Sequence, residues 1–399
     1  MPTFRFKHLR QQWPVGHGFF HTALVQLDRE TYRYVYDCGA ETFETINSQI
    51  NRYASNEAME GRGNSIDMLV VSHFHNDHIK GLPHFLSLFN VKKLVIPYLE
   101  EDDKLVALAG LAAHGAETWT LLSGLLIEPR EWLRTRSPDA ELIEITNNPI
   151  DDNPDVNDQI PPASGTGLSL GIGSISHHKR VSIFSQKKAV WTFKFYVQEC
   201  WEIYTLVLSG IIDKFSPSSQ SELMSWLSDA AWIQANHTAL KDVFKDIGSG
   251  KQNATTLCMY SGIERDQLDW MERDFSSSNH GPFYCRHWHW SRFGWLGTGD
   301  AELKSTNNMA AFERHYSDYL DEVDTVTIPH HGSIDNYNSK LSDIGYRHVI
   351  TADAAVDPKG HHPSANVLLN LNINSAYTHI ATLDDSSTLF DRFRGFGEI

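Results

Sequence analysis

The first third of the chain alternates short apolar runs with stretches in which apolar residues recur three and four positions apart. The short runs predict β-strands, and the wider spacing predicts amphipathic helices. Strands are therefore expected at 4–8, within 15–27 after a glycine turn, at 32–36, at 68–71 and at 91–97. Helices are expected at 43–53, at 79–89 and over about 103–135. Strand and helix thus follow each other along this part of the chain.

The middle of the chain changes in composition before the strand pattern returns. From about Asn147 to Gly173, proline, aspartate, asparagine, glycine and serine predominate, which indicates a long loop or a mobile lid. Beyond it, paired strands are expected at 191–197 and 203–208, a helix at 219–247 and a strand at 253–260. The C-terminal part predicts a hairpin around 285–290, strands at 294–300, 323–328 and 347–352, a helix at 364–371 and a last strand at 376–383.

The composition bounds the size and class of the protein. Its 399 residues suffice for one large domain or two ordinary ones, and 41% of them are hydrophobic, so a sizeable core can form. The formal net charge of −16 argues against a broad basic surface for nucleic acid, although not against a local basic groove. Four cysteines far apart in the sequence fit a reduced, cytoplasmic protein. The N-terminal residues contain no apolar signal core, so secretion is not expected. The sequence contains no apolar run of about 18 residues, so a membrane span is not expected either.

The segment Ser72–Gly81 introduces metal-binding chemistry. Three histidines and one aspartate fall within six residues, at His73, His75, Asp77 and His78. In extended backbone the first two histidines point the same way, because side chains alternate between the faces of a strand. The cluster follows a predicted strand and precedes a predicted helix, and ligand sites of α/β sheets lie outside such strand ends. Imidazole and carboxylate together suit zinc, and less specifically iron or manganese.

This His-x-His-x-Asp-His spacing resembles the metal motif of the metallo-β-lactamase superfamily. The resemblance implies an α/β fold, a four-layer αββα sandwich that holds one or two metal ions at one edge, with a large insertion in the middle third here. It continues at Asp37-Cys38-Gly39, which follows a predicted strand and resembles the Asp-x-Gly motif of the superfamily. This implies that Asp37 supports the metal-binding turn through hydrogen bonds without being a ligand, because such carboxylates orient metal-binding histidines.

Further candidate ligands follow in the last third of the chain. One predicted strand ends in Asp300, the next ends in Pro329-His330-His331-Gly332-Ser333, and His361-His362-Pro363 follows a third. Together with the strand at 253–260, these motifs resemble the catalytic domain of the DNA-uptake competence proteins and the bacterial phosphorylcholine esterases. The resemblance implies two divalent metal ions, zinc ahead of manganese or iron. One would be held by His73, His75, Asp300 and one of His330 and His331, and the other by Asp77, His78, Asp300 and His362.

Several assignments stay open at the level of the sequence. Adjacent residues on a strand point oppositely, so we expect one of His330 and His331 to bind metal and the other to contact substrate or donate a proton. Asp77, His330 and His331 are the candidate catalytic residues, and His361 is an alternative to His362. His17 and Lys80 are candidate substrate contacts, and His21 is a further histidine near the first glycine turn. The basic stretch 177–188 is a candidate phosphate site, and Cys285, His287 and His289 are a candidate second metal site, with a solvated loop and simple packing as the respective alternatives.

These features lead to three hypotheses. The first is a binuclear metal-dependent phosphodiesterase or nuclease, in which two cations lower the pKa of a bridging water to give the attacking hydroxide. Two cations with two carboxylates leave a positive centre, which favours an anionic phosphoester such as nucleic acid. The second is a hydrolase of a lactone, thioester or choline phosphoester. The third is a subunit of an assembly, by analogy one of bacterial defence, in which residues 136–250, an insertion within a single domain of 1–399, dock a protein partner.

Overall fold

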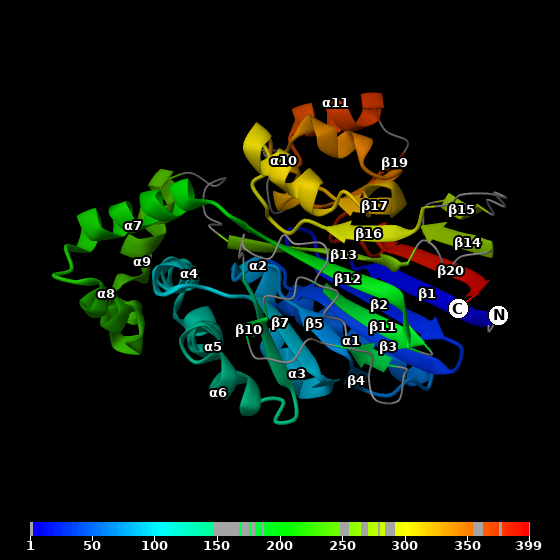
Figure 1. Cartoon of the computed structure of the whole chain (residues 1–399). Helices are drawn as coiled ribbons and strands as arrows, with labels where there is room; N and C mark the ends of the chain where they lie inside the picture. The colour runs from blue at the N-terminus through cyan, green and yellow to red at the C-terminus, as the bar shows by residue number, and fades with distance from the viewer. Residues whose placement is uncertain are drawn as a thin grey trace.

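The computed structural model describes residues 3–146, 167–169, 175–176, 180–185, 187–247, 255–264, 270–277, 280–283, 292–353, 362–374 and 377–398. In these residues two β-sheets pack face to face, and helices cover the outer face of each sheet (Figure 1). The architecture is the αββα sandwich that the sequence motifs imply.

The first sheet contains both parallel and antiparallel strands. Over the described residues its order is β10-β8-β7-β5-β3-β2-β1-β20-β14-β15. The pairs β3–β5, β5–β7 and β7–β8 are parallel, whereas β1 runs antiparallel to both β2 and β20. The strands are β1 (Thr3–Gln12), β2 (Phe20–Leu27), β3 (Glu30–Cys38), β5 (Met68–Val70), β7 (Lys93–Pro97), β8 (Glu141–Ile145), β10 (Ile175–Ser176), β14 (Trp270–Ser277), β15 (His280–Phe283) and β20 (Leu389–Glu398).

The second sheet has the order β19-β18-β17-β16-β13-β12-β11-β9 in the described part of the chain. Strands β16 to β19 are parallel, so their carboxyl ends meet at one edge. The strands are β9 (Gly167–Ser169), β11 (Arg180–Ser185), β12 (Lys188–Glu199), β13 (Thr255–Ile263), β16 (Gly294–Gly297), β17 (Val323–Thr327), β18 (Arg347–Thr351) and β19 (Tyr377–Ala381). A separate short parallel pair joins β4 (Ser65–Ile66) to β6 (Asn90–Val91).

A continuous apolar layer fills the space between the two sheets. It is built from the inward positions of alternating strands, such as Phe6 and Tyr34 from the first sheet and Trp191, Phe193 and Trp295 from the second. All five side chains are buried. Burial on this scale is the main force that holds the sheets together, at roughly 25 cal/mol per Å² of apolar surface.

Two groups of helices cover the outer faces. On the first sheet lie α1 (Phe43–Met59), α2 (Asn76–Ile79), α3 (Leu82–Leu88), α4 (Glu101–Ala113), α5 (Ala116–Ile127) and α6 (Pro129–Arg134), with α7 (Trp201–Phe215), α8 (Gln220–Leu227) and α9 (Ala230–Ile247) packed against α4 (Figure 1). On the second sheet lie α10 (Thr306–His315) and α11 (Ala365–Asn374). Short 3-10 turns occur at Leu320–Glu322, His330–Gly332, Ser339–Asp343 and Asp385–Ser387.

Two expectations for the middle of the chain are wrong. Residues 203–208, expected as a strand, lie within α7, because Tyr204, Val207 and Ile211 are buried at helical spacing against the neighbouring helices. A short apolar run does not by itself distinguish a strand from a buried helix. The helix expected over 219–247 is two helices, α8 and α9, separated by Ser228 and Asp229.

The chain also does not end with the strand expected at 376–383. Strand β20 follows it and pairs with β1 along its whole length, from Thr3 opposite Glu398 to Gln12 opposite Leu389. Within residues 136–250, strand β8 belongs to the first sheet and β11 and β12 belong to the second. That segment is therefore partly built into the sandwich. Its boundary as an insertion stays a prediction.

Candidate metal centre

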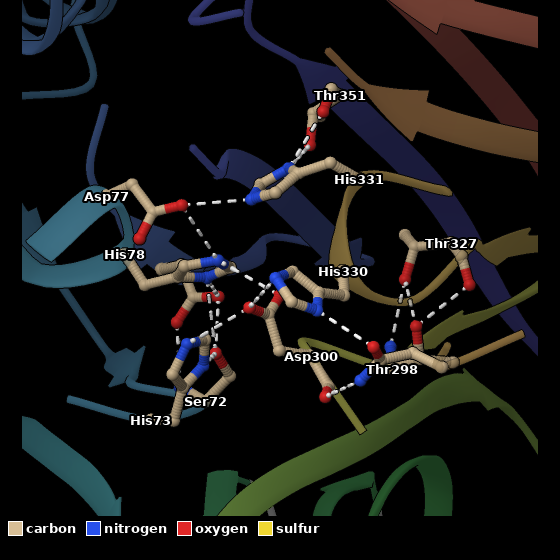
Figure 2. A network of polar contacts seen from close by, with 12 residues as sticks. Ser72, His73, Asp77, His78, Thr298, Asp300, Thr327, His330, His331 and Thr351 are labelled. Atoms are coloured by element: carbon tan, nitrogen blue, oxygen red, sulfur yellow. Dashed lines mark hydrogen bonds and ion pairs between the residues drawn. The ribbon is translucent and has the colours of Figure 1, made fainter. Parts of the chain in front are cut away.

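The candidate ligands and Asp37, which supports them, converge from four strand ends at one edge of the sandwich. Asp37 closes β3, the His73–His78 motif follows β5, Asp300 follows β16, and His330 and His331 follow β17. Figure 2 shows one set of side chains directed toward a common centre, with Thr351 at the end of β18 behind His331; the set is His73, Asp77, His78, Asp300, His330 and His331. The parallel pairing of these strands explains why segments more than 200 residues apart in the sequence meet here.

Asp37 fixes the orientation of the motif through hydrogen bonds. Its Oδ1 accepts a hydrogen bond from the backbone N–H of Ser72 at 2.6 Å, and its Oδ2 accepts from Ser72 Oγ at 2.7 Å and from His78 Nδ1 at 2.7 Å. Because a carboxylate only accepts, Nδ1 of His78 carries a proton, and its Nε2 faces the centre. Ser72 Oγ in turn lies 2.9 Å from Nδ1 of His73, which orients that ring in the same way.

Asp300 is positioned by a short link between two strands. The backbone N–H of Thr298 donates to Thr327 Oγ1 at 2.8 Å, and Thr298 Oγ1 donates to the Thr327 carbonyl at 2.9 Å. Gly299 has a positive φ of 51°, and a Cβ there would lie 2.9 Å from Cβ of Ser72. A glycine therefore lets the Asp300 turn approach the histidine motif closely.

The expectation that His330 and His331 point to opposite faces is wrong. The two residues do not form a strand but a 3-10 turn, with φ values of 49° and 55° in the left-handed region. Nδ1 of His330 lies 2.8 Å from Asn336 Oδ1, and Nδ1 of His331 lies 2.8 Å from the Thr351 carbonyl. Each Nδ1 donates to an oxygen, so both Nε2 atoms face the centre: that of His330 lies 3.8 Å from Asp300, and that of His331 lies 2.9 Å from Asp77.

The described residues contain two groups of potential metal ligands. Within each group, the ligand atoms all lie within 4.8 Å of one another. The first joins His73, His78 and Asp300, and the second joins Asp77, His78 and His331. Nε2 of His73 and Nε2 of His78 lie 3.5 and 3.3 Å from Asp300 but form no hydrogen bond within the described part of the chain. Buried polar atoms are normally hydrogen-bonded, so bare imidazole nitrogens facing carboxylates fit a bound divalent cation.

The electrostatics of the two carboxylates suit the same interpretation. Burial acts to raise the pKa of Asp77, but the imidazoles of His78 and His331 hold it well below its usual range. Burial likewise opposes ionisation of Asp300, and His330 and His78 nevertheless keep the pKa of this carboxyl well below its usual range. Both side chains are therefore anionic, as metal ligands must be.

The remaining predicted ligands lie around these groups. The ring of His75 is 5.1 Å from that of His73, and burial, together with the neighbouring His73, lowers the pKa of His75 to about 3. The ring of His362 is 5.3 Å from that of His330. The two closest groups share His78, which the sequence assigns to the second metal alone, and they contain neither His75 nor His362. The assignment of each residue to a metal stays a prediction.

The structure separates the candidate substrate contacts. The His17 ring lies 5.1 Å from that of His331, and Nδ1 of His17 accepts a hydrogen bond from the backbone of Asp353 at 3.2 Å, so His17 borders the centre. Lys80 donates to the Glu41 carbonyl, and its ammonium lies 5.3 Å from the Phe43 ring. Lys80 therefore contacts the start of α1, and its role toward a substrate stays a prediction.

Other predicted features lie elsewhere. His21 is buried between the sheets and stacks on Trp295 at 4.3 Å between ring centroids, so it does not border the centre. The long loop at 147–173 is outside the described residues except for 167–169, as are His361, residues 177–179 of the basic stretch, and the candidate set Cys285, His287 and His289.

Sequence reasoning missed the residues that orient the histidines from behind. Ser72, Asn336 and Thr351 provide the oxygen atoms that hold His73, His330 and His331. Ser72 could have been found from the sequence, because it directly precedes the first histidine of the motif at the end of a predicted strand. Asn336 and Thr351 belong to no motif, and only the packing of β17 and β18 brings them to the site.

Comparison with known families agrees with this geometry. Residues 18–180 match the family model described as Metallo-beta-lactamase superfamily. The matched part contains Asp37 and the His73–His78 motif, whereas Asp300 and the later histidines lie beyond the match. Members of the superfamily are mostly metal-dependent hydrolases. A comparison with curated proteins found no match.

Among the residues that the structure describes, no helix is both long enough and apolar enough to span a bilayer.

Proposed function

We propose that this protein is a hydrolase with two divalent metal ions, zinc ahead of manganese or iron, that cleaves phosphodiesters. The observation that carries the proposal is the pair of overlapping ligand groups around His78, which contain three imidazoles and two carboxylates. The Nδ1 atoms of His73, His78 and His331 each lie at hydrogen-bond distance from an oxygen, and their Nε2 atoms face the two carboxylates. Pre-oriented ligands of this kind are typical of metal sites in proteins.

The charge of the site supports an anionic substrate. Asp77 and Asp300 supply two negative charges, and histidines bind a metal ion in their neutral form, so two divalent cations would leave the centre positive. Divalent cations at such a centre lower the pKa of water to give hydroxide at neutral pH and stabilise the charge of a phosphoryl group. An acidic protein surface would otherwise repel such a substrate, so the local charge of the centre is the deciding feature.

The residues of the chain have separate roles in this proposal. His73 and Asp300 would hold one cation and Asp77 and His331 the other, and the one remaining ring nitrogen of His78, Nε2, would bind one of the two. His330 faces the Asp300 side at 3.8 Å and is placed to contact a substrate oxygen or to protonate a leaving group. His17 borders His331 and would contact the substrate from the opposite rim.

The first test measures metal. We expect about two zinc, manganese or iron ions per chain by mass spectrometry in protein purified without added metal. Replacing Asp300 by alanine should remove one or both of them, whereas Asp335→Ala, which changes a solvent-exposed carboxylate paired with Lys304, should leave the content unchanged. Wild-type protein that binds no metal even after reconstitution would contradict the proposal.

The second test measures turnover. We expect hydrolysis of bis-p-nitrophenyl phosphate and of single- or double-stranded nucleic acid with added zinc or manganese, and a loss of at least about a hundredfold in Asp300→Ala, since even residues behind the ligands are worth 10–100-fold. Lactone, thioester and phosphorylcholine substrates complete the panel. Turnover of those compounds without any phosphodiester cleavage would replace the proposed substrate class. The likeness to the competence-protein branch and docking of a protein through residues 136–250 stay predictions.

A further inference from the structure

Asn336 connects the two turns that carry Asp300 and His330. It is almost completely buried, and its backbone and its side chain each form one hydrogen bond to each turn. Toward the turn after β17, its backbone N–H donates to the Ser333 carbonyl at 3.2 Å, and its Oδ1 lies 2.8 Å from Nδ1 of His330. Toward the turn after β16, its carbonyl accepts from the backbone N–H of Leu303 at 3.0 Å, and its Nδ2 donates to the Asp300 carbonyl at 3.0 Å. One residue therefore fixes the two turns relative to each other.

The orientation of the Asn336 amide follows from these contacts. The Asp300 carbonyl only accepts hydrogen bonds, so the group that faces it must be the amide nitrogen of Asn336. The amide oxygen then faces Nδ1 of His330, and that nitrogen carries the proton of the hydrogen bond. A rotated amide would bring its oxygen against the Asp300 carbonyl, where neither atom has a proton to donate. The network therefore allows one orientation of the amide.

This orientation selects one tautomer of His330. Which ring nitrogen of a neutral histidine carries the proton is set by the hydrogen bonds that the ring makes. With the proton on Nδ1, Nε2 of a neutral His330 presents a lone pair, and this atom lies 3.8 Å from Asp300 Oδ2 (Figure 2). At that position the ring can bind a cation or accept a proton, and it can donate a proton from Nε2 only as an imidazolium ion.

We propose that Asn336 is a positioning residue of the metal centre. It holds His330 as the Nδ1–H tautomer and anchors the turn that presents the Asp300 carboxylate. The proposal rests on the hydrolase function proposed above, in which Asp300 is a metal ligand. The amide meets both requirements because it offers an acceptor to His330 and a donor to Asp300, whereas a carboxylate offers only acceptors and leucine offers neither. Residues that hold metal ligands in this way typically change metal affinity by about 10–100-fold without touching the metal.

The experiment compares the full-length wild type with Asn336→Leu and Asn336→Asp. Long-range ¹H–¹⁵N NMR of protein with labelled histidine, recorded without added metal, reports the tautomer of each imidazole, and the spectrum of His330→Gln identifies the His330 signals. We expect the Nδ1–H tautomer in the wild type and in Asn336→Asp, which keeps an acceptor for Nδ1, and its loss in Asn336→Leu. Competition with a chelator measures zinc affinity, which should fall by about 10–100-fold in Asn336→Leu.

Asn338→Leu is the matched control, because it removes the same kind of hydrogen bonds two residues away. The side chain of Asn338 donates to the Lys304 carbonyl at 3.1 Å and accepts from the backbone N–H of Lys340 at 3.2 Å. Both of these partners are backbone groups. The control variant should therefore melt at a lower temperature than the wild type, yet keep the His330 tautomer and the zinc affinity unchanged.

The two measurements also separate this proposal from the hydrolase function. Loss of the Nδ1–H tautomer and weaker zinc binding in Asn336→Leu, with neither change in Asn338→Leu, would support the positioning role. The proposal is overturned if Asn336→Leu keeps the wild-type tautomer of His330, or if it binds zinc as tightly as the wild type. A wild type that binds no zinc would contradict the hydrolase function, and the tautomer of His330 in Asn336→Leu would then decide alone whether Asn336 positions this ring.

Discussion

At the scale of a single residue, His8 shows how a buried imidazole connects stability to pH. It lies on β1 between the sheets, fully buried, with the rings of Trp191 and Phe393 at 4.5 and 5.7 Å between centroids. Burial lowers its pKa well below the usual value, and the charge of Arg10 lowers it further. The histidine of the unfolded chain titrates near pH 6.5, so it binds a proton below that pH. The folded chain does not bind this proton, because the ring is buried. Stability conferred by the neutral ring is therefore present above about pH 6.5 and is lost as the pH falls.

We expect His8→Phe to reduce the loss of stability between pH 7 and pH 5 by about 2 kcal/mol, since each pH unit below 6.5 costs about 1.4 kcal/mol per excluded proton. Phenylalanine keeps the ring contacts and removes the titration. Urea unfolding at the two pH values measures the change. The control is His237→Phe on α9, where the side chain is not fully buried. An identical pH dependence in wild type and His8→Phe would contradict the prediction. It would mean that His8 is charged in the folded protein or that its side chain is not buried as described.

At the scale of elements, Gly39 decides how closely β3 approaches the metal-binding turn. A Cβ at this position would lie 2.3 Å from the carbonyl carbon and oxygen of Asp77 and 2.4 Å from the backbone nitrogen of His78. These are backbone atoms, which cannot rotate away as a side chain could. The same carbonyl of Asp77 accepts a hydrogen bond from Phe19, and Gly39 donates to the Phe19 carbonyl. The glycine of the Asp-x-Gly motif is thus required by the contact between two elements.

Gly39→Ala should displace α2 from the end of β3. We expect a loss of about 1–3 kcal/mol in the free energy of unfolding, the usual cost of overpacking, and a metal content below that of the wild type. The matched control is Gly110→Ala in the middle of α4, where the new methyl group would meet only Phe244 at 3.8 Å and should stabilise the helix by about 0.5–1 kcal/mol. Unchanged metal content and unchanged stability in Gly39→Ala would refute this account of the motif.

At the scale of the whole molecule, a buried ionic network joins the two sheets. Arg10 of β1 lies 2.7 Å from Asp324 of β17 and 2.9 Å from Asp391 of β20, and Arg347 of β18 lies 2.5 Å from Asp391. Arg10 also donates to the Phe293 carbonyl at 3.0 Å. All four charged side chains are almost entirely buried. The attraction within such a network adds little to the free energy of unfolding. Removing one partner destabilises the protein by more than this, because the other charge is then buried without compensation.

Arg10→Leu should therefore lower the free energy of unfolding by about 3–5 kcal/mol, measured by urea denaturation. The double variant Arg10→Leu, Asp324→Asn should recover part of that loss, since the amide leaves no uncompensated charge, whereas Asp391 keeps Arg347 in both proteins. Strictly additive losses in the double variant would mean that the two residues do not interact.

Much of the fold follows from local patterns. The strands at β1 to β3, β5, β7, β13 and β16 to β19 appear in the sequence as alternating or continuous apolar runs, because backbone geometry imposes a period of two on any strand with a buried face. The same reasoning was insufficient at α7, where an apolar run is buried by neighbouring helices, and at β20, whose position beside β1 depends on pairing between the two ends of the chain.

The sequence by itself indicated the chemistry of the candidate site, because four candidate ligand side chains lie within six residues and Asp37 and Asp300 each lie at the end of a predicted strand. Only the tertiary structure decided how these groups are shared. The left-handed turn at His330 and His331 directs both rings inward, and the convergence of β3, β5, β16 and β17 places His78 in both ligand groups. Spacing along a chain specifies which side chains share a face locally, whereas the distance between two strand ends depends on packing across the whole sandwich.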